Sequence, residues 1–553
     1  MIKKIFGISL VAGMLLTSCS TSKIGATQEI PTSENQPFVW NAANVYFLLT
    51  DRFNNGDTTN DVNYGRTDKT AVLRGFEGGD IRGIIQKINE GYFTDLGVNA
   101  IWMTPIVEQI KGSVDEGQGA TYGFHGYWTK DWTSLDKNFG TEKDLHELVQ
   151  KAHEKGIRIM LDAVINHTGP VTELDEVFPA DWVRVTPQCT YDSYVNTTAC
   201  TLVKNLPDIL TESENDVTLP LQLLEKWQKE GRLKQEITEL NEFFTKYNLP
   251  KAPKYYIMKW LSDYIRDYGI DAYRVDTVKH TEEDVWKVFA QVCKDALAEY
   301  KAKNPNLAID NNEFFLLGEV YNYTINEGQM FSFPDKKVNY YENGFDALIN
   351  FDLRSSQEET NQQLFERYND IIQNEMKGKT VMNYISSHDD GSPYDKERKN
   401  TWDAGTKLLL TPGMSQIYYG DEIARPLVVN GADGDANLRS FMNWEDIKPN
   451  SETESLLNHF QKLGQFRRNH PAVGAGVQTV LKAEPYILHR KYKEDEVIIA
   501  LDYFREQKVI EVFNLWAEGT KVRDAYSGEI SVVKDGRVVL SSTSEIVLLE
   551  KIK

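Results

Sequence analysis

Eight short apolar runs recur along the sequence, and stretches with helical periodicity separate them. The runs are VYFLLTDRF (45–53), AIWMTPI (100–106), IRIMLDAVINH (157–167), DAYRVDTVKH (271–280), FFLLGEV (314–320), GFDALINF (344–351), TVMNYISSHD (380–389) and QIYYGDE (416–422). The stretches between them include EKDLHELVQKAHEKG and PKYYIMKWLSDYIRDYG. Continuous apolar strands with helical crossovers are typical of parallel sheets covered on both faces. Eight units in series predict an α/β fold, the closed (β/α)8 TIM barrel.

Polar residues collect at the last positions of these runs. A parallel barrel builds its active site at the carboxyl ends of its strands, so we expect these side chains to share one rim. They are Asn166, His167, Asp276, Glu319, His388 and Asp389.

One connection is too long for a single crossover. About a hundred residues separate the third run from the fourth, where a helix and two loops need about thirty. We therefore predict an inserted B domain at 168–215, with an added helical stretch at 218–249, and a barrel over 40–167 and 216–470. From 471 to 553 short alternating strands replace the pattern, which predicts a C-terminal antiparallel β-sandwich.

The N-terminus has the pattern of an export signal. Lys3 and Lys4 precede a short apolar stretch that ends in Leu-Thr-Ser-Cys at Cys19. The stretch is too short to span a membrane, and the ending resembles a bacterial lipobox, which implies lipidation of Cys19. An ordinary secretory signal with an incidental cysteine is the alternative. Residues 20–39 are predicted to be a flexible tether, and we expect a lipoprotein of the Gram-negative outer membrane, on either face.

The other cysteines fit an exported protein. Cys189 and Cys200 lie in one loop-like stretch, and export permits a disulfide between them. Cys293 lies on the apolar side of a helical pattern and is predicted to be a buried thiol.

The charge balance excludes one class of partner. Acidic residues outnumber basic ones 82 to 61, for a formal net charge of −21. Nucleic-acid-binding proteins concentrate positive charge, so we expect no nucleic-acid partner. The excess of acid fits a neutral ligand or a bound cation, and it fits solubility alone equally well.

Two carboxyl groups at the rim have surroundings that favour opposite protonation states. In GIDAYRVDTVKH, Arg274 and Asp276 point to the same face of a strand, and the arginine should keep Asp276 ionised. Glu319 ends the apolar run FFLLGEV, which should raise its pKa and keep it protonated. Glycoside cleavage needs such a pair, with Asp389 as a third carboxylate. Each residue alone could equally be a strand-end ion-pair partner or a helix cap.

Several segments, in order, resemble the signature motifs of the α-amylase family of glycoside hydrolases. They are DAVINH, GIDAYRVDTVKH, LLGEVYN and NYISSHD, followed by YYGDE and LGQFRRNHPAV, and the resemblance covers roughly 40–553. It implies the barrel, the inserted B domain and the C-terminal sandwich. It also implies a retaining mechanism on α-1,4-linked glucans such as starch and maltooligosaccharides.

The resemblance assigns roles residue by residue. It makes Asp276 the nucleophile, Glu319 the acid/base and Asp389 the carboxylate that binds the distorted sugar. Sugar contacts, or contacts that hold the carboxylates, are implied for His125, Tyr127, His167, Arg274 and His388, and an acceptor-side position for Lys279 and His280. Ser387 stands where the family usually has Asn, which leaves the contacts around it in doubt.

Calcium is the expected cofactor, at one or two sites. DRFNNGDTTND and GFEGGD supply oxygen ligands at short intervals and resemble the first calcium site of the cyclodextrin glucanotransferases; an Asx-rich turn is the alternative. The ligands implied there are Asn55, Asp57, Asn60, Asp61, Gly78 and Asp80. A second site is implied at Asn166, Asp208 and the carbonyl of His280.

The subgroup is harder to predict than the family. The insertion resembles that of periplasmic α-amylases of Gram-negative bacteria, whereas 51–106 also resembles cyclodextrin glucanotransferases. That transferase type normally carries two further C-terminal domains, so we expect a hydrolase, acting as a monomer. The alternatives are an α-glucan transglycosylase and a non-catalytic glucan-binding lipoprotein.

Overall fold

Eight parallel strands close into a barrel in the computed structural model, which describes residues 37–115 and 117–552. Around the barrel the strand order is β1-β16-β15-β14-β11-β10-β7-β2. Their bounds are β1 Asn44–Leu48, β2 Ala100–Met103, β7 Arg158–Ala163, β10 Ala272–Val275, β11 Phe315–Gly318, β14 Ala347–Asn350, β15 Thr380–Tyr384 and β16 Met414–Tyr418. Each lies inside one of the eight apolar runs, apart from one or two residues at the start of β1 and β16. The predicted barrel is therefore confirmed.

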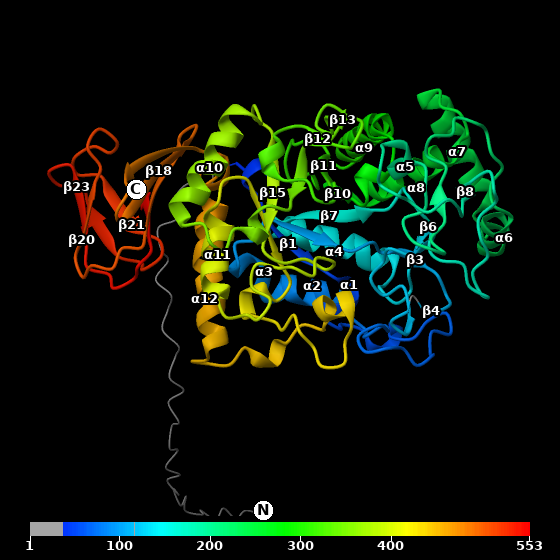
Figure 1. Cartoon of the computed structure of the whole chain (residues 1–553), viewed down its shortest axis with the longest axis horizontal. Helices are drawn as coiled ribbons and strands as arrows, with labels where there is room; N and C mark the ends of the chain where they lie inside the picture. Colours follow the sequence, from blue (N-terminus) through cyan, green and yellow to red (C-terminus); the bar gives the residue numbers. More distant parts are fainter. Residues whose placement is uncertain (1–36, 116, 553) are drawn as a thin grey trace, which may run out of the picture.

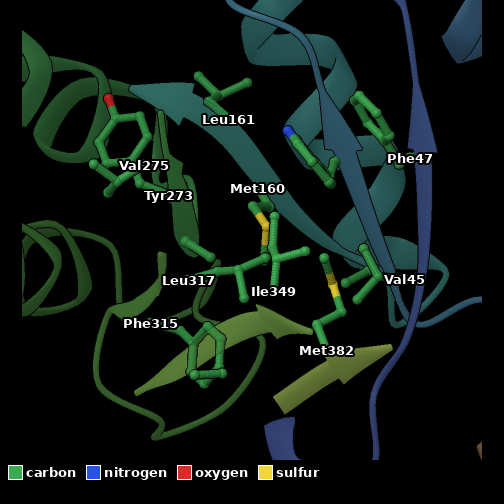
Figure 2. Close-up of a cluster of buried hydrophobic side chains, with 14 of the residues drawn as sticks. Val45, Phe47, Met160, Leu161, Tyr273, Val275, Phe315, Leu317, Ile349 and Met382 are labelled. Carbon is green, nitrogen blue, oxygen red and sulfur yellow. The ribbon is translucent and has the colours of Figure 1, made fainter. Parts of the chain in front are cut away.

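The strands are buried over their whole length, as continuous apolar runs require. Side chains from neighbouring strands fill the interior, among them Val45, Met160, Leu317, Ile349 and Met382 (Figure 2). The strands are also shorter than the runs that predicted them. β7 ends at Ala163 and β15 at Tyr384, so the polar residues at the ends of these two runs lie in loops just beyond the barrel.

Helices surround the barrel (Figure 1). They are α2 Ile81–Glu90, α4 Glu142–Glu154, α8 Pro253–Tyr268, α9 Glu283–Lys303, α10 Asn361–Asn374, α11 Thr401–Leu410 and α12 Glu452–Asn469. α4 shows why they form: Thr141 and Asp144 make a capping box at its start, and Leu145, Leu148, Val149 and Ala152 bury one face. No helix among the described residues is long and apolar enough to cross a membrane.

The long connection between β7 and α8 holds a small paired sheet and three helices. β8 Val183–Arg184 pairs with β9 Asp208–Ile209, and the short α5 Val195–Thr198 lies between them. The helical stretch expected at 218–249 forms α6 Leu221–Glu230 and α7 Leu233–Tyr247. In Figure 1 these elements lie at the end of the molecule opposite the C-terminal sheets.

The segment between β2 and α4 forms two short strand pairs that were not predicted from the sequence. β3 Val107–Gln109 pairs with β6 Thr129–Leu135, and β4 Val114–Asp115 with β5 Ala120–Thr121. The register of the β3–β6 pair shifts twice, and such irregular short strands leave little alternation in the sequence.

The C-terminal region is antiparallel, as predicted. Six strands form one sheet: β17 Val477–Lys482, β18 Tyr486–Tyr492, β19 Asp495–Leu501, β24 Val547–Lys551, β21 Lys521–Asp524 and β22 Ile530–Val532. β20 Lys508–Glu511 and β23 Arg537–Leu540 form a second pair. Ile498, Ile510, Val538 and Leu549 belong to the separate apolar core of this region.

Candidate active site

One buried arginine joins three carboxylates where β7, β10 and β11 end. Arg274, only 1% exposed, lies 2.7 Å from Asp276 Oδ1 through Nη1 and 3.3 Å from Glu319 Oε2 through Nη2. The same Nη1 lies 3.0 Å from Asp162 Oδ1 on the neighbouring strand, where Arg274 and Asp162 are direct register partners. The predicted nucleophile and acid/base thus share one guanidinium.

Glu319 has the surroundings of a general acid. Burial raises its pKa to about 8, against the opposing attraction of Arg274. One carboxylate oxygen accepts a hydrogen bond of 2.8 Å from the backbone N–H of Thr277. Thr277 has φ 49°, a left-handed conformation that a β-branched residue rarely adopts. The burial of Glu319 thus shifts its pKa in the direction predicted from the sequence.

Asp389 lies beyond the end of β15 and faces more open space. Its side chain is 41% exposed, and Nε2 of His388 lies 3.8 Å from Oδ2. Partial burial would raise the pKa of Asp389, but the charges of His388 in its protonated form, Arg274 and Arg439 hold it below its ordinary value. Ser387 donates a hydrogen bond of 3.1 Å to Oδ1 of Asp389, so the serine at the unusual position still contacts the carboxylate.

Aromatic rings line the carboxylate cluster. Tyr127 donates from its hydroxyl to Asp162 Oδ2 at 2.8 Å, and its ring stacks against His388 with centroids 5.2 Å apart. His125 accepts a hydrogen bond from the Tyr127 N–H at Nδ1, and Nε2 of His167 lies 3.1 Å from the Tyr127 carbonyl. Burial lowers the pKa values of His125, His167 and His388, that of His388 to about 4, so neutral imidazoles surround the site.

The two predicted acceptor-side residues follow β10 in the 3-10 helix η3 Val278–His280. Lys279 donates from Nζ to the carbonyl of Tyr321 at 3.2 Å. His280 is 5% exposed, and burial lowers its pKa to about 4. The predicted catalytic and sugar-binding residues therefore lie at or just beyond the carboxyl ends of the barrel strands, except His125 and Tyr127. These two precede β6 in the connection after β2, and from there Tyr127 contacts Asp162 and His388.

Sequence reasoning missed Asp162. It accepts hydrogen bonds from Trp102 Nε1 at 3.1 Å and from Tyr127, besides its contact with Arg274. Burial raises its pKa to about 7. The available signal was a lone carboxylate inside the apolar run IRIMLDAVI, since a charged residue there requires a buried partner.

The first predicted calcium-binding segment has oxygen atoms that suit a cation. Among the described residues, Asn55 Oδ1 and Asn60 Oδ1 are buried without a hydrogen-bond partner. Asp61 accepts from Asn55 Nδ2 at 2.9 Å, and Asp80 accepts from Asn60 Nδ2 at 3.2 Å. At Gly78 a Cβ would lie 2.5 Å from Asn55 Nδ2, so only glycine allows this approach.

Two of the predicted ligands at this segment have other partners as well. Asp57 accepts from Thr59 and caps the short 3-10 helix that follows it. Asp80 is the N-cap of α2. Nowhere in 37–115 or 117–552 do three or more His, Cys, Asp or Glu side chains gather in a group that could hold a metal. The fit to calcium therefore depends on amide and backbone oxygens besides the carboxylates of Asp61 and Asp80.

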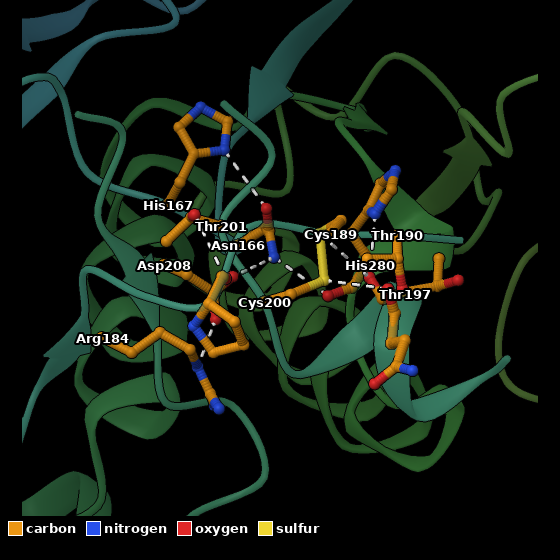
Figure 3. The surroundings of a disulfide bond; sticks show 12 residues. Asn166, His167, Arg184, Cys189, Thr190, Thr197, Cys200, Thr201, Asp208 and His280 are labelled. Atoms are coloured by element: carbon orange, nitrogen blue, oxygen red, sulfur yellow. Dashed lines mark hydrogen bonds and ion pairs between the residues drawn. A yellow bond between two sulfur atoms is a disulfide. The ribbon is translucent and has the colours of Figure 1, made fainter. Parts of the chain in front are cut away.

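The second predicted calcium-binding set lies together but is already paired. Asn166 donates from Nδ2 to Asp208 Oδ1 at 2.9 Å and to the His280 carbonyl at 3.0 Å. Nε of Arg184 lies 2.7 Å from Asp208 Oδ2 (Figure 3). An amide nitrogen and a guanidinium thus contact the oxygens that a cation would need.

The cysteine predictions have two outcomes. Cys189 and Cys200 form the predicted disulfide, and Cys293 is a buried free thiol. Cys19, the signal and most of the tether lie outside the described residues.

Comparison with known proteins identifies the catalytic region. The family model for the α-amylase catalytic domain matches residues 47–526. The periplasmic α-amylase of Escherichia coli K12 is 35% identical over 88% of this chain and 76% of its own length. A cyclomaltodextrin glucanotransferase of Niallia circulans is 26% identical over 90% of this chain, which spans 63% of that relative.

Solved structures share the fold. An Anoxybacillus α-amylase aligns over 94% of this chain and 99% of its own with a TM-score of 0.63 and 24% identity. A cyclomaltodextrin glucanotransferase described as having a three-domain ABC distribution aligns over 92% and 99%, with a TM-score of 0.63 and 20% identity. At these identities the likeness concerns the fold alone.

Proposed function

Because this chain belongs to the α-amylase family of glycoside hydrolases, we propose that it hydrolyses α-1,4-glucosidic bonds in starch-like glucans and maltooligosaccharides. The observation that carries the proposal is the pair of carboxyl groups on one guanidinium. Asp276 contacts Arg274 at 2.7 Å, and burial raises the pKa of Glu319 to about 8. Glycoside cleavage with retention needs such a pair, a carboxylate nucleophile and a protonated acid.

The reaction proceeds in two balanced steps. Asp276 attacks C1 of the sugar while Glu319 gives its proton to the departing glycosidic oxygen, which leaves a glucosyl ester on Asp276. Water then attacks C1, Glu319 takes its proton, and Asp276 is released as a carboxylate. Arg274 and the Thr277 N–H hold the two groups throughout.

Other residues of the rim bind and orient the sugar. The Tyr127 ring offers an apolar surface to the C–H face of a glucose unit, and its hydroxyl fixes its position through Asp162. Asp389 is the partly exposed carboxylate, free to accept hydrogen bonds from sugar hydroxyls as the transition state forms. Lys279 and His280 lie on the acceptor side.

We also propose calcium at the first predicted segment. Asn55, Asn60, Asp61 and Asp80, with the Gly78 backbone, would hold it, and when bound it stabilises the loop before α2. We place no metal at Asn166 and Asp208, because their polar atoms already satisfy one another and Arg184.

Asp276→Asn tests the hydrolase proposal. The variant should release no reducing sugar from maltoheptaose while its circular dichroism and melting temperature match those of the wild type. Asp284→Asn is the matched control, since Asp284 is an exposed carboxylate in the first turn of α9 and should leave turnover unchanged. Wild-type turnover in Asp276→Asn would refute the nucleophile assignment. A wild type that binds maltoheptaose without cleaving it would favour the non-catalytic alternative.

Transglycosylation is the second candidate, because glucanotransferases align with about nine-tenths of this chain. Domain number does not separate the two activities, since one solved glucanotransferase structure is itself described as having three domains. Chromatography of products from starch, pullulan and maltoheptaose decides: linear products support hydrolysis, and cyclic products support transfer.

We propose that this protein is exported, that a lipid anchors it, and that it acts as a monomer. Support comes from the signal pattern before Cys19 and from a relative named as periplasmic. Radiolabelled palmitate should enter the wild type and not Cys19→Ala. Equal labelling of both would refute lipidation at Cys19.

A further inference from the structure

A loop closed by a disulfide lies against the candidate active site. A disulfide joins Cys189 and Cys200, which are 11 positions apart in the sequence. The two ends of the loop are also joined by a backbone hydrogen bond of 2.9 Å from the Cys189 N–H to the Thr201 carbonyl. Inside the loop the chain forms the single turn α5, and Thr197 and Thr198 on it are buried. The loop belongs to the long connection after β7, yet its contacts reach residues that follow β10.

The central contact joins the loop to His280. Nδ1 of His280 lies 3.0 Å from the carbonyl oxygen of Thr197. A carbonyl can only accept, so Nδ1 carries the hydrogen in this contact. In a neutral ring with the hydrogen on Nδ1, Nε2 is the acceptor. Figure 3 shows this second nitrogen pointing away from the disulfide loop.

Among the described residues, the Thr197 carbonyl is the hydrogen-bond partner of the His280 ring. Asn166 holds the same residue by its backbone carbonyl, at 3.0 Å, which fixes the main chain but leaves the ring free to rotate. The edge of Tyr191, also in the loop, lies against the ring with centroids 5.8 Å apart. The orientation of the His280 ring is therefore set by the loop.

The far side of the loop is fastened to the barrel. Tyr194 N–H donates to Asp335 Oδ1 at 2.7 Å, and its hydroxyl donates to Glu283 at the start of α9. Lys336 pairs with Glu283 at 2.5 Å and lies over the Tyr194 ring at 3.7 Å.

We propose that the disulfide-closed loop 189–200 positions the acceptor side of the active site, by holding the Thr197 carbonyl against His280 so that Nε2 accepts a hydrogen bond from a sugar hydroxyl. The role of this acceptor rests on the proposed hydrolase function, whereas the hold of the loop on His280 does not. Thr197 is a positioning residue, since it acts through His280.

The test opens the loop with Cys189→Ser/Cys200→Ser and compares two substrates. Maltoheptaose places sugars on the acceptor side, whereas α-maltosyl fluoride has fluoride as its leaving group and places no sugar there. We expect KM for maltoheptaose to rise about three- to tenfold, the scale of one hydrogen bond, with α-maltosyl fluoride unaffected. Thr190→Ala is the matched control, because Thr190 lies in the loop and bonds Asp192 rather than His280.

A double-mutant cycle shows whether His280 transmits the effect. In a His280→Ala background, opening the loop should cost nothing further for maltoheptaose, because the two changes remove the same interaction. An equal loss with both substrates, or the same loss with and without His280, would show that the disulfide only stabilises the fold and would overturn the proposal.

A spectroscopic measurement separates this inference from the function. In ¹⁵N-histidine-labelled protein, with His280→Ala identifying the signal, His280 should be the Nδ1–H tautomer, and opening the loop should give a mixture of tautomers. This result is expected even from a wild type that cleaves neither substrate. An unchanged Nδ1–H tautomer after opening would refute the positioning role.

Discussion

The protonation of Glu319 should set the alkaline limit of activity. Burial raises its pKa from 4.5 to about 8. With a pKa of 8, about 90% of the molecules carry the proton at pH 7, whereas with a pKa of 4.5 only about 0.3% would. The buried position of Glu319 therefore supplies roughly 300-fold more active acid at neutral pH.

The assay is the pH dependence of kcat/KM for maltoheptaose, which reports groups of the free enzyme. We expect an alkaline limb with its midpoint near pH 8, falling tenfold per pH unit above it. Glu319→Gln should abolish activity on maltoheptaose, which needs protonation of its leaving oxygen. The same variant should retain the first step on α-maltosyl fluoride, whose leaving group needs little acid, and azide should restore its turnover by replacing water without a base.

Two results would refute this reasoning. An alkaline midpoint near pH 5 would mean that burial does not raise the pKa of Glu319. An alkaline limb near pH 8 that persists for α-maltosyl fluoride in Glu319→Gln would assign the ionisation to another residue.

Three further predictions follow from other contacts. Asp162→Asn should lower kcat for maltoheptaose about 100-fold with little change in melting temperature, because Arg274 and Tyr127 lose the carboxylate that aligns them; unchanged kcat would contradict this. Chelation with EDTA should lower the melting temperature and added calcium should restore it, whereas an unchanged melt would count against the site at Asn55 and Asn60. His470, bonded to Asp495 and Glu550, has a pKa raised to about 9 by these partners despite burial, above its ordinary 6.5. The shift corresponds to about 3 kcal/mol in the free energy of unfolding, which is complete below pH 6.5 and lost as pH rises through 9. The free energies of urea unfolding of wild type and His470→Gln should therefore differ by about 3 kcal/mol less at pH 10 than at pH 6. A difference that does not change with pH would contradict this prediction.

The barrel was predictable because each of its strands is buried on both faces and therefore apolar throughout. The same rule explains why the irregular β3–β6 pair escaped prediction. Its residues TKDWTSL in β6 mix buried and partly exposed positions around shifts of register. Glu319 was predictable as an acid because the apolar residues of its own run, FFLLGEV, indicate that it is buried. Asp162 was not assigned a role, because its partners Trp102, Tyr127 and Arg274 come from three distant segments.

The sequence by itself determined the barrel, the rim at which polar residues gather and the family. These follow from local patterns: strand length, apolar continuity and motifs read within one segment. Only the tertiary structure decided which groups share Arg274, and that the Cys189–Cys200 loop reaches His280. It also decided that Asp208 is paired with Arg184 while Asn55 and Asn60 keep unpaired oxygens. The physical reason is that hydrogen bonding and burial depend on distances between residues that the chain brings together only when it folds.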